Sequence, residues 1–128
     1  MMVKREVIEI PGVTHGKAPI PMGAKIGSVV YSSAIMGKDP SSDELPMDAE
    51  RQIYFLYRNI ESFMKEAGGS TENIIRMSVY LKDNSLRELF NQEWLKMFPD
   101  PKNRPARHIA LADLHNGMCA QVELIAVL

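Results

Sequence analysis

The sequence contains a single cysteine, Cys119, among its 128 residues. One thiol cannot form a disulfide within the chain, and such sparse use of cysteine is typical of a reducing compartment. The three histidines, at positions 15, 108 and 115, are scattered, with no pair at ligand spacing. A zinc site is therefore not expected, and the fold must be stabilised by its own hydrophobic core.

Long apolar runs and an excess of one charge are also missing. No run approaches the roughly 20 residues of a membrane-spanning helix, and residues 1–6 lack the apolar core of a signal peptide. The formal net charge is −1, so neither nucleic acid nor an anionic membrane is indicated as the main partner. We expect a cytoplasmic protein with one domain over residues 1–128.

What the sequence does contain is clear periodicity. Alternating or β-branched apolar residues predict strands, whereas apolar residues spaced by three and four predict helices. The expected strands span residues 6–10, 24–26, 29–36, 74–81, 108–112 and 121–127, and the expected helices span residues 47–67 and 86–97. In the strand at 74–81, Ile75 is expected to share a face with Met77, Val79 and Leu81.

Local signals mark where these elements end. Gly68-Gly69 stops the first helix, and Ser85 with Glu88 has the spacing of a capping box before the second. Asn116-Gly117 is a strong turn pair, so the last two strands are expected to pair with each other.

The order of elements predicts an α+β sandwich, with two helices on one face of a six-stranded mixed sheet. Two amphipathic helices can cover only one face of such a sheet. The other face also carries Ile, Val and Leu side chains, which another subunit must cover if water is to be excluded. The sequence therefore indicates an oligomer.

Two charged residues interrupt the final apolar segments. Arg107 opens the run 108–112, where an unpaired charge costs several kcal/mol, so it requires a protein carboxylate or a ligand. Glu123 is expected on one strand face with Ile125 and Val127, where a carboxylate needs a cationic partner or a catalytic role. If the last two strands pair, Arg107 and Glu123 meet. A structural ion pair and a functional pair are then equal alternatives.

Other polar residues are weaker candidates. Asn91 lies beside the apolar stripe of the second helix, where its amide could bond a loop or face a pocket. Ser32-Ser33 interrupts an apolar strand, as an exposed edge would. His15 lies in a loop and could line a pocket, whereas Cys119 has no activating neighbour and is expected in the core. The sequence has no phosphate-binding glycine loop and no nucleophile elbow.

Three segments together resemble the RidA/YjgF reactive-intermediate deaminases, also called L-PSP endoribonucleases. NIESFMKEAGGSTENIIRMSVYLKD follows the family pattern N-I-x-x-x-x-x-x-A-G-x-S-x-x-N-I, FNQEWLKMFP is like N-x-x-Y-x-x-F-F, and RPARH precedes a Glu-x-x-Ala strand, ELIAV. The similarity covers nearly the whole chain from about Ala18. It implies a chorismate-mutase-like fold, a homotrimer with ligand clefts between subunits, and no metal or organic cofactor.

The resemblance also implies an activity, the hydrolysis of enamine or imine intermediates such as 2-aminoacrylate and 2-aminocrotonate to 2-oxo acids and ammonia. Arg107 matches the arginine that binds the substrate carboxylate, and Glu123 matches the glutamate that holds the attacking water. Asn91 matches a pocket asparagine. Ser33 and Ala34 match the Ser-Gly pair whose backbone borders the ligand.

The chain departs from the family at several of these positions. Ile20 replaces a pocket tyrosine, Ala34 replaces the glycine, Ile109 replaces a common cysteine, and the loop before Glu123 is one residue longer. These changes predict a more apolar pocket and a different natural imine. The alternative is a non-catalytic trimer that binds small carboxylates as a sensor or regulator. RNA cleavage is disfavoured by the near-neutral charge and the lack of a basic, aromatic-rich patch.

Overall fold

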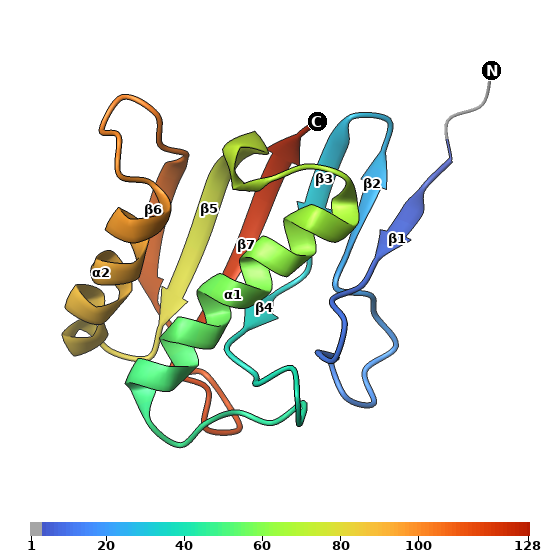
Figure 1. Cartoon of the computed structure of the whole chain (residues 1–128). Helices are drawn as coiled ribbons and strands as arrows, with labels where there is room; N and C mark the ends of the chain where they lie inside the picture. Colours follow the sequence, from blue (N-terminus) through green and yellow to red (C-terminus); the bar gives the residue numbers. More distant parts are fainter. Residues whose placement is uncertain (1–3) are drawn as a thin grey trace.

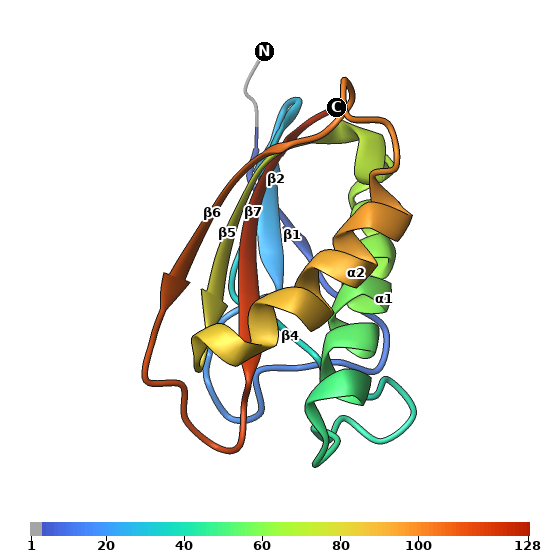
Figure 2. The same ribbon diagram turned by 90° about the vertical axis from the view of Figure 1, so that its left-hand side faces the viewer.

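The computed structural model describes residues 4–128. A mixed sheet carries both helices on one face, as the edge-on view in Figure 2 shows. In chain order the elements are β1 (Glu6–Ile8), β2 (Gly23–Ile26), β3 (Val29–Ser32), β4 (Ile35–Met36), α1 (Ala49–Ala67), the 3₁₀ turn η1 (Thr71–Asn73), β5 (Ile74–Leu81), the 3₁₀ turn η2 (Asn84–Leu86), α2 (Arg87–Met97), β6 (Ala106–Leu111) and β7 (Ala120–Val127). The predicted α+β class is confirmed, and the elements follow the predicted order except that the expected third strand is divided into β3 and β4, so the sheet has seven strands and not six (Figure 1).

The long helix α1 ends at the predicted Gly68-Gly69 signal, whereas the cap at its start was not predicted. The Asp48 side chain accepts a hydrogen bond from the backbone N–H of Arg51 (3.0 Å) and caps the first turn. Gly68 ends the helix with φ of 95°, a left-handed conformation that glycine adopts without strain. The face that packs on the sheet carries Ile53, Leu56, Ile60, Phe63, Met64 and Ala67.

The start of α2 differs from the prediction. The capping box expected from Ser85 and Glu88 does not form. Instead, Asp83 accepts hydrogen bonds from the backbone N–H of Ser85 (2.9 Å) and from the Ser85 hydroxyl, and so caps the turn η2 that leads into α2. An aspartate is as good a cap as a serine, and here the earlier of the two residues takes the role.

The strand predicted over residues 29–36 is broken at Ser33-Ala34. Tyr31 pairs with Ile125 of β7, and Ile35 pairs with Val122. Residues 32, 33 and 34 therefore lie opposite only residues 123 and 124, which is one extra residue and defines a β-bulge.

The Ser32 side chain provides a hydrogen-bond acceptor for a backbone N–H group at this break. Its hydroxyl oxygen accepts a hydrogen bond from the backbone N–H of Leu124 (2.8 Å). Since β3 lies between β2 and β7, the two serines mark a bulge inside the sheet, and the exposed edge expected at Ser32-Ser33 is wrong.

The last two strands do not pair with each other. The sheet order is β1-β2-β3-β7-β5-β6, with β4 also paired to β7. Strand β5 separates them, pairing parallel to β6 and antiparallel to β7. Asn116-Gly117 does form a left-handed turn, with φ of 61° and 79°, but a turn fixes only the local reversal of the chain. Strand β6 carries charged and polar residues, which suit an edge position.

A register shift in β5 changes one predicted orientation. The pairing of β5 with β7 is irregular between Ile74 and Arg76. As a result Ile74 is buried and Ile75 is exposed, so the prediction that Ile75 shares the buried face of Met77 is wrong. A bulge adds one residue to the alternation, which the period of two could not anticipate.

Among residues 4–128, no element covers the face of the sheet opposite the helices (Figure 2). Its exposed apolar residues are Val7, Ile26, Val29, Tyr31 and Val127. An apolar hollow of about 230 Å³ opens there beside Ala24, Ile26, Val29 and Tyr31. We call this the open face, and the apolar uncovered surface expected from the sequence is confirmed.

Within residues 4–128, neither helix combines the length and apolarity needed to cross a membrane.

The segment after β4 is fixed to α1 by a buried amide. Asn59 donates hydrogen bonds to the carbonyl oxygens of Met36 and Lys38, both at 2.9 Å. Between them, Gly37 lies so close to α1 that a Cβ atom there would be 1.9 Å from the carbonyl oxygen of Gln52. The end of β4, and with it the bulge, is therefore held in place by the helix layer.

We expect Asn59→Ala to lower the free energy of unfolding by about 1–3 kcal/mol, because the two carbonyl oxygens lose their donor inside the protein. Urea unfolding measures this change. Glu66→Ala, at an exposed position of the same helix, serves as the control and should change stability by about 0.5 kcal/mol or less. Equal urea concentrations at the unfolding midpoints of the two variants would contradict the anchoring role of Asn59.

Candidate functional site

Arg107 lies inside β6 and points to the helix layer. It pairs in register with Met77, which is fully buried beneath the helices. Its Nη1 atom donates a hydrogen bond to Oδ1 of Asn91 on α2 (2.8 Å). The guanidinium carbon is 4.6 Å from the ring centroid of Trp94 and 5.8 Å from that of Phe90. The sequence placed Arg107 at the mouth of the strand, whereas it is a half-buried residue within it.

The charge of Arg107 has no counter-ion in the described chain. Among residues 4–128, no carboxylate oxygen lies within 4.0 Å of its guanidinium. Burial is the main reason that the pKa of Arg107 is lowered, and the positive charge of Arg87 acts in the same direction. Arginine nevertheless remains protonated at any physiological pH. A half-buried cation of this kind is suited to bind an anion from outside its own chain.

Glu123 lies on the opposite face of the sheet. It pairs with Ser78, the neighbour of Met77 in β5, and adjacent residues of a strand point to opposite faces. It shares that face with Ile125 and Val127, as predicted, but its side chain is exposed there. The expected meeting of Arg107 and Glu123 in one chain is therefore wrong, and so is the structural ion pair between them.

Glu123 instead adjoins the bulge. Residue 123 is one of the two β7 positions opposite Ser33-Ala34. Ser33 donates from its hydroxyl to the carbonyl oxygen of Pro21 (2.8 Å) and from its backbone N–H to that of Met22 (2.8 Å). These bonds hold the loop of Ile20, a half-exposed residue, against the bulge. We call Ile20, Ser33, Ala34 and Glu123 the bulge group.

A second set forms around the cation. Ile109 follows Arg107 by two residues on the same face of β6 and packs against the edge of the core. We call Arg107, Asn91, Ile109 and Trp94 the arginine group. Trp94 lies in the helix predicted over residues 86–97 but was not among the expected site residues. Its position three residues after Asn91, on the same side of a helix, was the signal that could have placed it beside the cation.

Three other reactive side chains lie outside both groups. Burial, and then the charge of Lys38, lowers the pKa of His15, whose Nε2 atom has no hydrogen-bond partner in the described chain. His108 is exposed on the open face. Burial raises the pKa of Cys119 to about 11, which favours the neutral thiol, and its predicted place in the core is confirmed. Within residues 4–128, no three His, Cys, Asp or Glu side chains gather as metal ligands.

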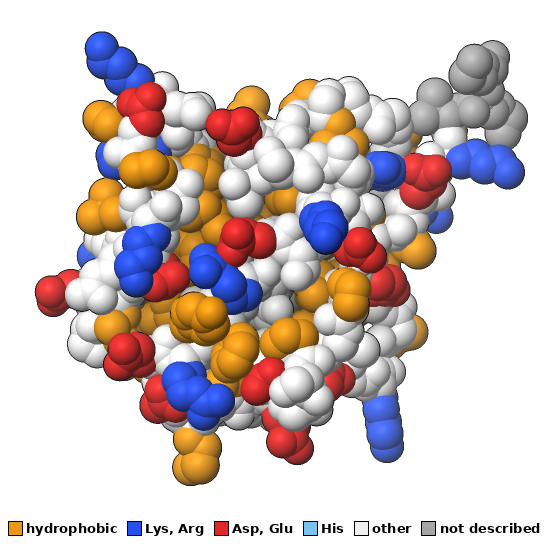
Figure 3. Space-filling model, in the orientation of Figure 1, with side chains coloured by type: hydrophobic (Ala, Val, Ile, Leu, Met, Phe, Trp, Pro, Cys, Tyr) orange, Lys and Arg blue, Asp and Glu red, His pale blue; other side chains and the backbone are white. Residues whose placement is uncertain are grey.

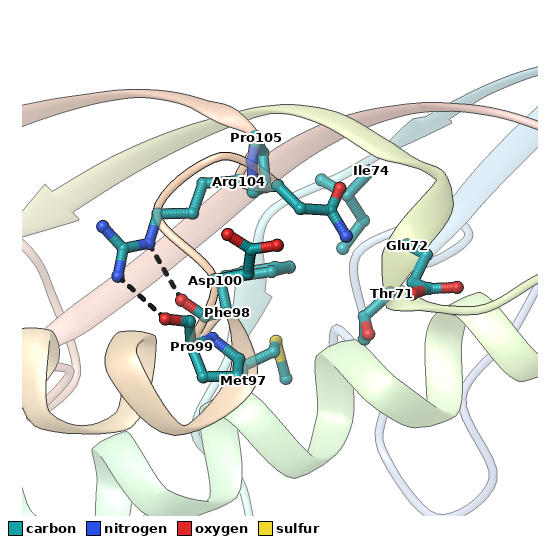
Figure 4. Close-up of a pocket in the computed structure, with 10 residues that line it drawn as sticks. Thr71, Glu72, Ile74, Met97, Phe98, Pro99, Asp100, Arg104 and Pro105 are labelled. Carbon is teal, nitrogen blue, oxygen red and sulfur yellow. Dashed lines mark hydrogen bonds between the residues drawn. The ribbon is translucent and has the colours of Figure 1, made fainter.

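A cavity of about 280 Å³ lies where α2 ends and the chain turns toward β6 (Figure 4). Ile74 and Phe98 are its buried lining residues. Arg104 closes the end of α2 by donating from Nε to the carbonyl oxygen of Phe98 (2.9 Å). None of the residues expected in the site lines this cavity.

On the helix-covered surface, side chains of both charges are interspersed with apolar ones, without a basic patch (Figure 3).

We expect Asn91→Asp to give Arg107 an internal counter-ion and to raise the free energy of unfolding by about 1–2 kcal/mol at pH 7. The guanidinium would depress the pKa of the introduced carboxyl in the folded state. The gain should therefore be present above the unfolded-state pKa of about 4 and be lost as the pH falls through the folded-state pKa. Urea unfolding at pH 7 and pH 3 measures it. Gln92→Glu adds the same charge at an exposed neighbouring position, and equal stabilities of the two variants at pH 7 would argue against the geometry described.

Known proteins share both this sequence pattern and this fold. Residues 18–128 match the family described as endoribonuclease L-PSP. The 3-aminoacrylate deaminase RutC of Acinetobacter baylyi is 28% identical over 122 residues, covering 94% of this chain and 87% of that protein. The putative reactive intermediate deaminase TdcF of Escherichia coli is 26% identical over 125 residues, covering 96% and 97% of the two chains.

Solved structures of members of this family have the same fold. TdcF of E. coli with bound serine superposes with a TM-score of 0.85 at 25% identity, covering 95% of this chain and 98% of that one. RidA of an Antarctic Psychrobacter species gives 0.87 at 25% identity, covering 96% and 99%. The chain therefore belongs to the endoribonuclease L-PSP family, the group that includes the RidA, TdcF and RutC proteins.

Proposed function

We propose that the protein hydrolyses reactive enamine or imine intermediates, of the 2-aminoacrylate or 2-aminocrotonate type, to 2-oxo acids and ammonia. The observation that carries the proposal is the half-buried Arg107 guanidinium, which has an amide and two aromatic rings around it but no carboxylate within residues 4–128. Family members named as deaminases support the type of reaction.

In the proposed reaction Arg107 anchors the substrate carboxylate through two parallel, charge-assisted hydrogen bonds. The enamine first tautomerises to the imine. Glu123 orients a water molecule and accepts a proton from it as the oxygen attacks the imine carbon. The proton taken up by Glu123 passes to the nitrogen and gives a carbinolamine. The hydroxyl group of this intermediate then loses its proton, which also reaches the nitrogen, the carbon–nitrogen bond breaks, ammonia leaves, and the carbonyl group of the 2-oxo acid remains. No metal or organic cofactor takes part.

We also propose that the site forms between protomers of a homotrimer. The arginine group and the bulge group lie on opposite faces of one sheet, so one small substrate can contact both only if they come from two chains. The open face, with exposed Ile26, Val29 and Tyr31, offers apolar surface for such contacts. Ile20, Ser33, Ala34 and Glu123 of one chain would then border the substrate held by Arg107, Asn91 and Ile109 of its neighbour.

A second candidate function is a non-catalytic trimer that binds 2-oxo acids as a sensor or regulator. Two observations favour it: Ile20 provides no hydroxyl group at the bulge, and Ala34 adds a methyl group there. Carboxylate binding by Arg107 is common to both functions. They differ only in whether the bound imine is hydrolysed faster than in buffer.

We expect the protein to accelerate 2-oxo acid release in a coupled assay with a serine or threonine dehydratase. Arg107→Ala should abolish the acceleration and weaken 2-oxobutyrate binding at least about tenfold, because the charge-assisted bonds are lost. Glu123→Gln should keep the binding and lower turnover by about 100-fold or more, as loss of general-base catalysis does. Binding of 2-oxobutyrate without acceleration by the wild-type protein would support the sensor instead.

Subunit mixing tests the two-chain site. Arg107→Ala and Glu123→Gln chains, each inactive alone, are unfolded, mixed in equal amounts and refolded. If each site takes Arg107 from one chain and Glu123 from the next around a ring, about a quarter of the sites should regain both residues and activity. The control mixes wild-type chains with the double variant, where the same quarter of sites is fully wild type. No recovery in the first mixture, with recovery in the control, would place both residues in one chain.

A further inference from the structure

We infer that Trp94 is a positioning residue for Arg107: its indole ring supports the guanidinium so that one edge stays open to the substrate carboxylate. This inference rests on the proposed role of Arg107 as the carboxylate anchor. It extends that role to a side chain which does not itself need to touch the substrate.

The guanidinium has aromatic and polar contacts in the described chain. The guanidinium carbon lies over the ring of Trp94, 4.6 Å from its centroid, which is within the range of a cation–π contact. Asn91 accepts a hydrogen bond from Nη1. Among the described residues, no partner bonds to Nε or Nη2 of Arg107. The edge that carries these two nitrogens can therefore bind a carboxylate in bidentate fashion while the ring supports the cation.

Trp94 is itself firmly placed. Only 8% of its surface is exposed. Its ring packs against Phe98 at a centroid distance of 4.7 Å and an interplanar angle of 59°. A ring fixed from one side can hold a flexible arginine side chain on the other, and this lowers the entropy that Arg107 loses when a ligand binds. The cation would otherwise be free to turn toward water, since no carboxylate in residues 4–128 holds it.

The composition of the chain provides a direct reporter. Trp94 is the only tryptophan, so all indole fluorescence comes from the ring beside Arg107. We expect titration with 2-oxobutyrate to change the emission of the wild-type protein, with the same Kd that calorimetry gives. Arg107→Ala should abolish this change. An unchanged emission at a saturating concentration of 2-oxobutyrate would overturn the inference without requiring any variant of Trp94 to fold.

Substitutions separate positioning from packing. Trp94→Met keeps an apolar side chain of adaptable shape but removes the aromatic face. We expect it to raise the Kd of 2-oxobutyrate and the KM of the deaminase reaction about five- to thirty-fold, with kcat changed less than about twofold. Trp94→Tyr retains an aromatic face and should stay within about threefold of the wild type.

Ile8→Val is the control for stability, because it removes a buried methyl group on β1, at the edge of the sheet opposite β6, and touches neither Trp94 nor Phe98. It should lower stability while changing the Kd by less than about twofold. An unchanged Kd in Trp94→Met, or an equal loss of binding in Ile8→Val, would overturn the inference. If Arg107→Ala still binds 2-oxobutyrate, the proposed function fails. If Arg107→Ala loses binding and Trp94→Met does not, only the positioning role fails.

Discussion

The structure depends on how a sheet accommodates one uncompensated positive charge. Arg107 enters β6 beside the fully buried Met77, on the side where helices pack, and no carboxylate is supplied for it within residues 4–128. The position of β6 at the edge of the sheet lowers the free-energy cost of this charge, because water reaches one side of Arg107 while Asn91 and Trp94 contact the other. Were β6 in the centre of the sheet, the same charge would be far more costly to bury.

The sheet also separates the two halves of the proposed site. Because Arg107 pairs with Met77 and Glu123 with the adjacent Ser78 of β5, the proposed carboxylate anchor and the proposed base face opposite directions. Under the proposed function, one protomer would therefore carry both halves of the site without bringing them together. The apolar open face gives neighbouring chains a physical reason to associate. Burial of the apolar open face would then have two effects. It would hold the chains together, and it would bring the two halves of the proposed site next to each other.

Much of the fold could be predicted because it depends on local patterns. The stripe of α1, its Gly68 cap and the alternation of β7 are all properties of consecutive residues. The failures concern choices between distant segments. The Asn116-Gly117 turn reverses the chain, but nothing near it shows that β5 will lie between the strands it joins. Arg107 and Glu123 were singled out as charges in apolar segments. Their separation by the sheet depends on strand order and could not be predicted. Trp94 could have been placed beside Asn91 from its spacing of three residues on one helix.

The bulge at Ser33-Ala34 determines to which face of the sheet the side chains after it point. In an unbroken strand Ile35 would point the same way as the exposed Tyr31, yet it is fully buried opposite Val122. One additional residue thus converts an outward position into an inward one and lets Met36 reach its bond with Asn59. The number of residues between Tyr31 and Ile35 should accordingly tolerate less variation than their identities, since a single deletion would rotate β4 out of the core.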